Sequence, residues 1–214
     1  MLSKKLIGSF MLAGPFLAIA SMVLFSPGGD DQTFAQELQA MSENYTMSSI
    51  AMVSFFAAIM MIFIGIHSLA RSMQGENKPG SDLAGLASIF ALLIAGIVMI
   101  STGIDLVVTE KGSSWVTSGG DVVGTFAISE AMIRSIFVFD GIVMLLLGLA
   151  IVKQKNLSLI VGGFFIFFGA CVLFGGMLSE GDNWAGMIWF IGFLGFPIIT
   201  AVTGFLTLRN AKNK

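Results

Sequence analysis

Six runs of mainly apolar residues divide this chain and restrict what it can fold into. They cover residues 6–25, 48–70, 83–108, 127–152, 157–178 and 185–208. Each run reaches the length of about 20 residues that an α-helix needs to cross the hydrocarbon core of a bilayer. The sequence therefore predicts an all-α fold, with residues 1–214 forming one polytopic membrane bundle of six transmembrane helices.

The composition of the chain agrees with a membrane location. Hydrophobic residues make up 56% of the sequence and charged residues only 11%, whereas about a quarter of a soluble domain is charged. The formal net charge is -2, so the sequence offers no basic surface for a nucleic acid and we expect no such partner. The partner that this composition implies is the lipid bilayer itself.

The connections between the apolar runs are polar and mostly short. The first, SPGGDDQTFAQELQAMSENYT, opens with turn residues and then places Phe34, Leu38 and Met41 at helical spacing. We therefore expect an amphipathic stub over about residues 33–43, lying at the outer membrane surface. The segments QGENKPGSD and KGSSWVTSGGD are predicted to be loops. No connection is long enough to hold a soluble domain.

Basic residues favour one side of the predicted membrane. They fall at the N-terminus, in the second and fourth connections and after the last run: Lys4, Lys5, Arg71, Lys78, Lys153, Lys155, Arg209, Lys212 and Lys214. The other connections hold Lys111 and most of the acidic residues. Because cytoplasmic loops carry an excess of Lys and Arg, we expect a multi-pass protein of the cell membrane with both termini cytoplasmic.

The first apolar run has a second interpretation. Lys4 and Lys5, the apolar run and the segment 18–20 (Ala-Ile-Ala) are also typical of a secretory signal with its cleavage site. Apolar residues continue to Phe25, however, which makes the run long enough to span. We expect a retained first helix; cleavage would leave five helices with the same orientation.

Two charged residues of the fourth run, Glu130 and Arg134, are expected in an outer polar layer. They are four residues apart, so they share one face of a helix and can pair. The third run is antiparallel to the fourth and brings Asp105 to a similar depth. We therefore expect Arg134 to be held by Glu130 and Asp105. A structural ion pair that joins the two helices is the simpler interpretation of this layer.

Asp140 is a different case because it falls near the middle of the membrane. An unpaired charge at that depth costs roughly 2.5–3.5 kcal/mol on insertion scales. Either the carboxyl is protonated, or a neighbouring helix supplies hydrogen-bond donors. The sequence leaves two roles open for Asp140, a buried structural carboxyl and a proton or cation site.

Two apolar runs contain glycine and proline near their centres. These are Gly14 and Pro15 in the first run, and Gly195 and Pro197 in the sixth. Proline removes a backbone donor and frees a carbonyl one turn earlier. Paired interruptions at the midplane are typical of transporter binding sites, so these four residues are candidate helix breaks. Simple helix packing is the explanation that we favour.

The sequence lacks the usual signatures of catalysis and of bound groups. It contains no nucleotide-binding loop, no HExxH and no Gly-x-Ser-x-Gly. One histidine, His67, and one cysteine, Cys171, cannot build a His-rich or Cys-rich metal site. We therefore predict no catalytic residue, no cofactor and no metal ligand. Asn44-Tyr45-Thr46 is a glycosylation sequon on the expected outer face.

Three functions are compatible with these features. The first is a non-enzymatic accessory or scaffold subunit that acts by association in the membrane, with a membrane protein or a second copy of the chain as partner. The alternative is a small proton- or cation-coupled transporter or channel that uses Asp140. The third is a lipid-active membrane enzyme with Glu130 and Asp105 as an acid–base pair.

Overall fold

The computed structural model describes residues 2–24, 33–117, 120–155, 157–178 and 183–212, and these form seven α-helices without strands. The helices are α1 (Lys4–Leu24), α2 (Phe34–Glu43), α3 (Tyr45–Ser72), α4 (Ser81–Thr117), α5 (Val122–Gln154), α6 (Leu159–Leu178) and α7 (Asn183–Lys212). All of them except α2 are long and apolar enough to cross a membrane. The predicted all-α fold is confirmed for the described residues, and the six long, apolar helices indicate a multi-pass membrane protein.

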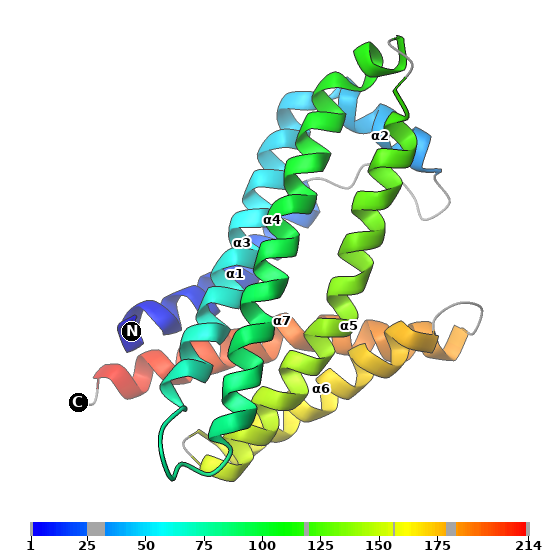
Figure 1. Ribbon diagram of the computed structural model, residues 1–214. Coiled ribbons are helices and arrows are strands. Elements are labelled where there is room, and N and C mark those ends of the chain that lie inside the picture. Colours follow the sequence, from blue (N-terminus) through cyan, green and yellow to red (C-terminus); the bar gives the residue numbers. More distant parts are fainter. Residues whose placement is uncertain (1, 25–32, 118–119, 156, 179–182, 213–214) are drawn as a thin grey trace.

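The six long helices form a closed ring in which each packs against two neighbours. In ring order they are α1, α3, α4, α5, α6 and α7, and α7 returns to α1. In Figure 1, α3 and α4 stand at a wide angle to α1, α6 and α7, while both ends of the chain lie close together. The short connections make sequential neighbours antiparallel, as their lengths predict.

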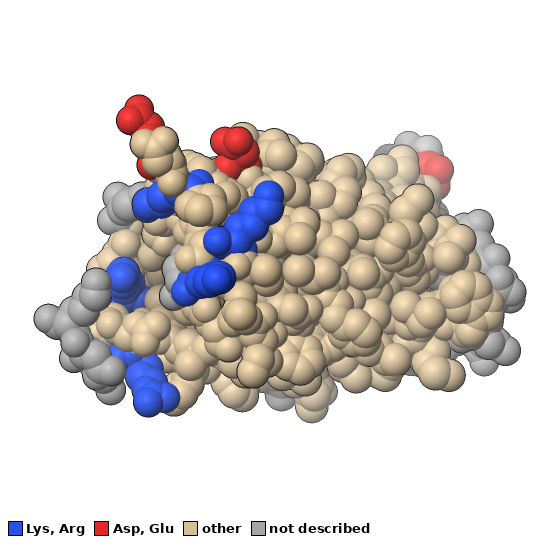
Figure 2. Space-filling model, turned by 90° about the horizontal axis from the view of Figure 1, so that it is seen from below, with Lys and Arg blue, Asp and Glu red and all other residues tan. Residues whose placement is uncertain are grey.

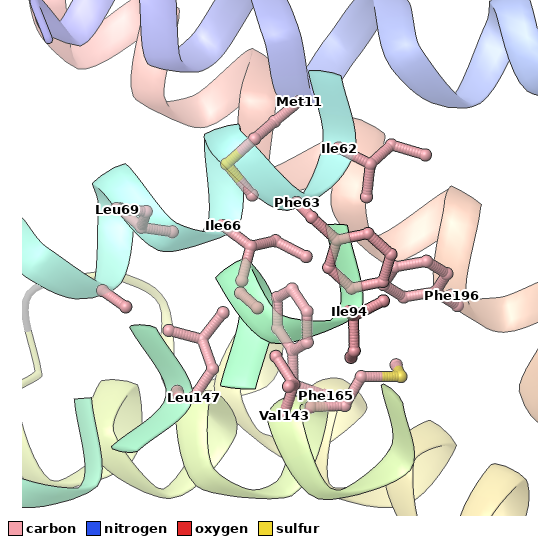
Figure 3. Close-up of a cluster of buried hydrophobic side chains, with 14 of the residues drawn as sticks. Met11, Ile62, Phe63, Ile66, Leu69, Ile94, Val143, Leu147, Phe165 and Phe196 are labelled. Atoms are coloured by element: carbon pink, nitrogen blue, oxygen red, sulfur yellow. The ribbon is translucent and has the colours of Figure 1, made fainter. Parts of the chain in front are cut away.

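One hydrophobic core fills the centre of this ring. Figure 3 shows side chains that point into it from the surrounding helices. The rings of Phe63 on α3 and Phe196 on α7 stack there with their centroids 6.0 Å apart. Met11, Ile94, Leu147 and Phe165 bring in the other four helices. Because every long helix contributes, the core ties the whole ring together.

Glycines allow several helix pairs to approach closely. A Cβ atom on Gly141 of α5 would lie 2.8 Å from the carbonyl oxygen of Gly169 on α6. One on Gly148 would lie 2.8 Å from the carbonyl oxygen of Gly162, two turns further along the same pair. Small residues at such positions let membrane helices pack backbone against backbone. This use explains much of the glycine content of the chain.

The candidate helix breaks at Gly14, Pro15, Gly195 and Pro197 are absent from the structure, because α1 and α7 continue through both prolines. The glycines serve packing instead. A Cβ on Gly14 would lie 2.8 Å from Ile62 of α3, and one on Gly195 would overlap the ring of Phe168 of α6. Neighbouring helices can support a proline inside a membrane helix, and α1 and α7 each pack against two neighbours.

The end of α4 also differs from its expected position. The predicted loop KGSSWVTSGGD is helical as far as Thr117, nine residues beyond the apolar run. A helix does not have to end where it leaves the membrane, because its backbone hydrogen bonds are internal. The first pair of consecutive glycines in this segment, Gly119-Gly120, comes only after Thr117.

Charge is distributed unevenly over the molecule. Both chain ends, the connection after α3 and the connection after α5 lie at one end, which we call the basic end. Figure 2 shows Lys and Arg side chains gathered toward the left of the view, at this end of the molecule. The basic side chains described there are Lys4, Lys5, Arg71, Lys78, Lys153, Lys155 and Arg209. Helix α2 lies at the opposite end, the α2 end (Figure 1).

Candidate functional site

Helix α2 is specified by its own short sequence. Its N-cap residue Thr33 forms a capping box with Gln36. The backbone N–H of Thr33 donates to Gln36 Oε1 at 2.9 Å, and the backbone N–H of Gln36 donates to Thr33 Oγ1 at 3.4 Å. Such a box satisfies two backbone donors that a helix start otherwise leaves unpaired. The prediction of a short helix over about 33–43 is therefore confirmed.

The apolar side of α2 packs on the bundle. Leu38 and Met41 are buried against Val108 of α4 and against Val122 and Phe126 of α5. These side chains form a second, smaller hydrophobic cluster at the α2 end. Helix α2 consequently lies across the ends of α4 and α5, with Gln36, Gln39 and Ser42 exposed.

Beneath α2 lies a group of polar side chains that we call the α2-end cluster: Glu37, Ser101, Asp105, Thr109 and Ser129. Ser101, Asp105 and Thr109 recur every four residues on α4, so they share one helix face, and all three are buried. Ser129 comes from α5, and its Oγ lies 2.5 Å from Ser101 Oγ. The cluster thus joins α4 and α5 by polar contacts next to the apolar seat of α2.

Asp105 is the central charged member of this cluster. Its side chain is 7% exposed. Its carboxyl lies within hydrogen-bonding reach of Ser129 and close enough to Glu37 for the two acids to interact electrostatically. Asp105 Oδ1 and the neighbouring Thr109 Oγ1 are buried and have no hydrogen-bond partner among the described residues. Burial also raises the pKa of Glu37 above its ordinary value of 4.5.

Glu130 and Arg134 lie on α5 next to the α2-end cluster. Glu130 follows Ser129 directly and is half-buried. The backbone of Arg134 lies one turn closer to the basic end. The side chain of Arg134 lies outside the described residues, so its pairing with Glu130 and Asp105 stays a prediction.

Asp140 occupies a separate, apolar setting. Its side chain is 5% exposed, and it shares its helix face with the buried residues Ile136, Val143 and Met144 of the central core. Asp140 Oδ1 has no hydrogen-bond partner among the described residues. The next residue, Gly141, contacts Gly169 in the middle of α6. Asp140 therefore lies level with the middle of α6, and its depth in a membrane stays a prediction.

His67 lies against Ser88 of α4. Its Nδ1 lies 2.8 Å from Ser88 Oγ and 3.1 Å from the Ser88 carbonyl oxygen. This contact joins α3 to α4. Asn44 of the sequon is exposed between α2 and α3, at the α2 end; its glycosylation stays a prediction.

The structure thus separates the predicted polar residues into two places. Asp105 and Glu130 lie at the α2 end, and Asp140 lies in the core. No group of three or more His, Cys, Asp or Glu side chains comes together among the residues described. Glu37 and Thr109 were not expected near Asp105. The sequence feature that could have placed Glu37 there is its position beside Leu38 and Met41, on the apolar side of the stub.

Comparison with known protein families, with curated proteins and with solved structures finds no match to this chain. Its function is therefore argued from its own residues.

Proposed function

We propose that this protein acts by association in the membrane, as a non-enzymatic accessory or scaffold subunit. The observation that carries this proposal is the outward face of α4. A Cβ atom added at Gly96 or Gly103 would meet no other atom within 4 Å. These two glycines serve no contact inside the bundle, yet small residues on a lipid-facing surface allow another helix to approach closely.

A shallow groove accompanies the second of these glycines. It is lined by Ile100, Gly103, Ile104, Val107, Val108 and Thr125. The missing side chain at Gly103 opens the groove, and the aliphatic side chains beside it offer ridges for packing. The occupant that we propose is a transmembrane helix, in the simplest case α4 of a second copy.

The proposal includes an orientation. The basic side chains gather at the end that holds both chain ends (Figure 2), and cytoplasmic loops are enriched in Lys and Arg. This distribution supports a cytoplasmic basic end and an outer α2 end, in the cell membrane.

Energy transfer between donor- and acceptor-labelled copies in lipid vesicles tests the association. We expect transfer in the unchanged protein and a marked loss in Gly96→Leu and Gly103→Leu, because the added side chains hold a second helix away. Gly163→Leu on α6 is the matched control, since a Cβ there also meets nothing within 4 Å. Association of copies is refuted if the unchanged protein shows no transfer. The role of α4 is refuted if Gly163→Leu loses as much transfer as the α4 variants.

Proton- or cation-coupled transport through Asp140 is the second candidate. The observation in its favour is a carboxyl that is almost fully buried and has an oxygen without a hydrogen-bond partner among the described residues. Such intramembrane acids commonly mark ion pathways. The test is the reactivity of Asp140→Cys with membrane-impermeant thiol reagents in a Cys171→Ala background, with Leu146→Cys as control. Selective reaction at position 140 supports an aqueous path; no reaction from either side excludes one.

A further inference from the structure

The described side chains of the α2-end cluster carry oxygen atoms as their polar groups. Asp105 contributes a buried carboxyl, Glu37 a second carboxyl from α2, and Thr109 and Ser129 contribute hydroxyls. The described basic side chains named above lie at the other end of the molecule. Carboxylate and hydroxyl oxygens are hard ligands, which suit hard cations better than transition metals.

Two buried polar atoms in this cluster show that its hydrogen bonding is incomplete. Asp105 Oδ1 and Thr109 Oγ1 belong to side chains that are 7% and 2% exposed, respectively, and neither atom has a partner among the described residues. Buried polar groups in native proteins are almost always satisfied. Both side chains lie on one face of α4, on consecutive turns, and the adjacent residue Val108 packs against Leu38 and Met41 of α2. The lone pairs of these two oxygen atoms are therefore available to bind a cation.

We propose that the α2-end cluster binds a divalent cation of the Ca²⁺ class, held by Asp105 and Thr109 on α4 and by Glu37 on α2. Two carboxylates balance the charge of one divalent cation. Ca²⁺ accepts six to eight oxygen ligands in flexible geometry, whereas Mg²⁺ demands a regular octahedron. Two carboxyl groups and one hydroxyl, contributed by two helices, fit the flexible arrangement, and water completes the shell.

Binding has a structural consequence for α2. Glu37 is the cluster's only member on α2, and it lies beside Leu38 and Met41, which dock this helix on α4 and α5. Without a cation, the carboxylates of Glu37 and Asp105 repel each other, as like charges do. A bound cation converts that repulsion into a bridge, so it should fix α2 on the bundle.

The test uses the full chain in lipid nanodiscs with CaCl₂ as the probe. Titration calorimetry measures binding, and hydrogen–deuterium exchange measures the protection of the amides of α2. We expect a dissociation constant on the order of 10⁻³ M or tighter, together with slower exchange across α2. Asp105→Asn and Glu37→Gln should each weaken binding about tenfold or more, since even outer-shell changes at metal sites cost that much.

Control variants separate this site from general effects of charge. Glu43→Gln removes an exposed carboxyl from the same helix and should bind as the unchanged protein does. Thr109→Val keeps the shape of a ligand residue and should weaken binding even if Asp105→Asn fails to fold. The proposal is overturned if CaCl₂ produces neither heat nor protection in the unchanged protein. Equal protection by KCl at the same ionic strength, or full binding by Thr109→Val and Glu37→Gln, would overturn it as well.

Discussion

The contact between α5 and α6 is tight enough that one added methyl group should be measurable. In Gly141→Ala, the new Cβ would lie 2.8 Å from the carbonyl oxygen of Gly169 and 2.8 Å from the backbone nitrogen of Leu173. Ordinary contact begins at 3.4 Å, so each approach is about 0.6 Å too short. Both neighbouring atoms belong to the backbone of a helix. The strain cannot be relieved by turning a side chain, and α5 and α6 must move apart.

The size of the effect follows from two opposed terms. Overpacking of a well-packed interior costs typically about 1–3 kcal/mol. Alanine is a better helix former than glycine by up to about 1 kcal/mol. For Gly141→Ala we expect the free energy of unfolding to fall by about 1–2 kcal/mol. Gly163→Ala gains the helix term alone, because its Cβ meets nothing within 4 Å, so its stability should stay the same or rise slightly.

Reversible unfolding in mixed micelles or by steric trapping in bicelles measures both variants against the unchanged protein. Gly148→Ala offers a second instance, because its Cβ would lie 2.8 Å from the carbonyl oxygen of Gly162. The reasoning is refuted if Gly141→Ala and Gly148→Ala are as stable as Gly163→Ala. Close backbone approach would then not limit the packing of α5 against α6.

Three further predictions concern α2 and the core. The folded pKa of Glu37 is raised by burial above 4.5, so without a divalent cation the docking of α2 should be strongest at and below pH 4.5 and should weaken as the pH rises through the raised pKa. A fluorescent probe on Ser42→Cys in a Cys171→Ala background measures this docking, and Glu37→Gln should remove the pH dependence. Leu38→Ala should weaken docking of α2 by about 2 kcal/mol or more by the same probe, while unfolding of the bundle stays unchanged. Asp140→Leu should raise the free energy of unfolding by about 1 kcal/mol or more, because it removes a buried polar atom without a partner; a loss of stability would contradict this.

The spanning helices could be predicted because lipid imposes one demand on a long stretch of chain. Every residue in contact with hydrocarbon must be apolar, and the backbone must bond to itself. The composition of each run therefore identifies a helix without knowledge of its neighbours. The ends are less certain, as α4 shows: beyond residue 108 the sequence is no longer selected by lipid, but the helix continues to Thr117.

Prolines illustrate what a single sequence does not specify. Pro15 and Pro197 each lose a backbone hydrogen bond, and local rules predict an interruption. Whether the helix continues depends on the helices around it, and here the tight contacts at Gly14 and Gly195 hold α1 and α7 in place. Those contacts depend on tertiary packing, which no local pattern describes.

The candidate site was predictable in part for the same reason. The depth of Asp105 and Asp140 follows from counting residues along a helix, since the rise is constant. The meeting of Asp105 with Glu37 does not, because it requires α2 to fold back over α4 and α5. The spacing of Leu38 and Met41 predicts an amphipathic helix, but it applies equally to a helix lying on lipid and to one docked on protein.

The closed ring of helices has a consequence for the synthesis and insertion of the chain. Gly8 on α1 and Gly204 on α7 meet, although roughly 200 positions separate them, and a translating ribosome delivers domains from the N-terminus onward. Helix α1 can pair with α3 early, but its other side stays against lipid until α7 is inserted. A stalled chain would therefore expose that side of α1 to membrane quality control. A circular permutant that joins the two neighbouring ends and opens the connection between α3 and α4 would make α7 and α1 consecutive helices, so their contact could form as soon as α1 is inserted, and the contact between α3 and α4 would be the last to close.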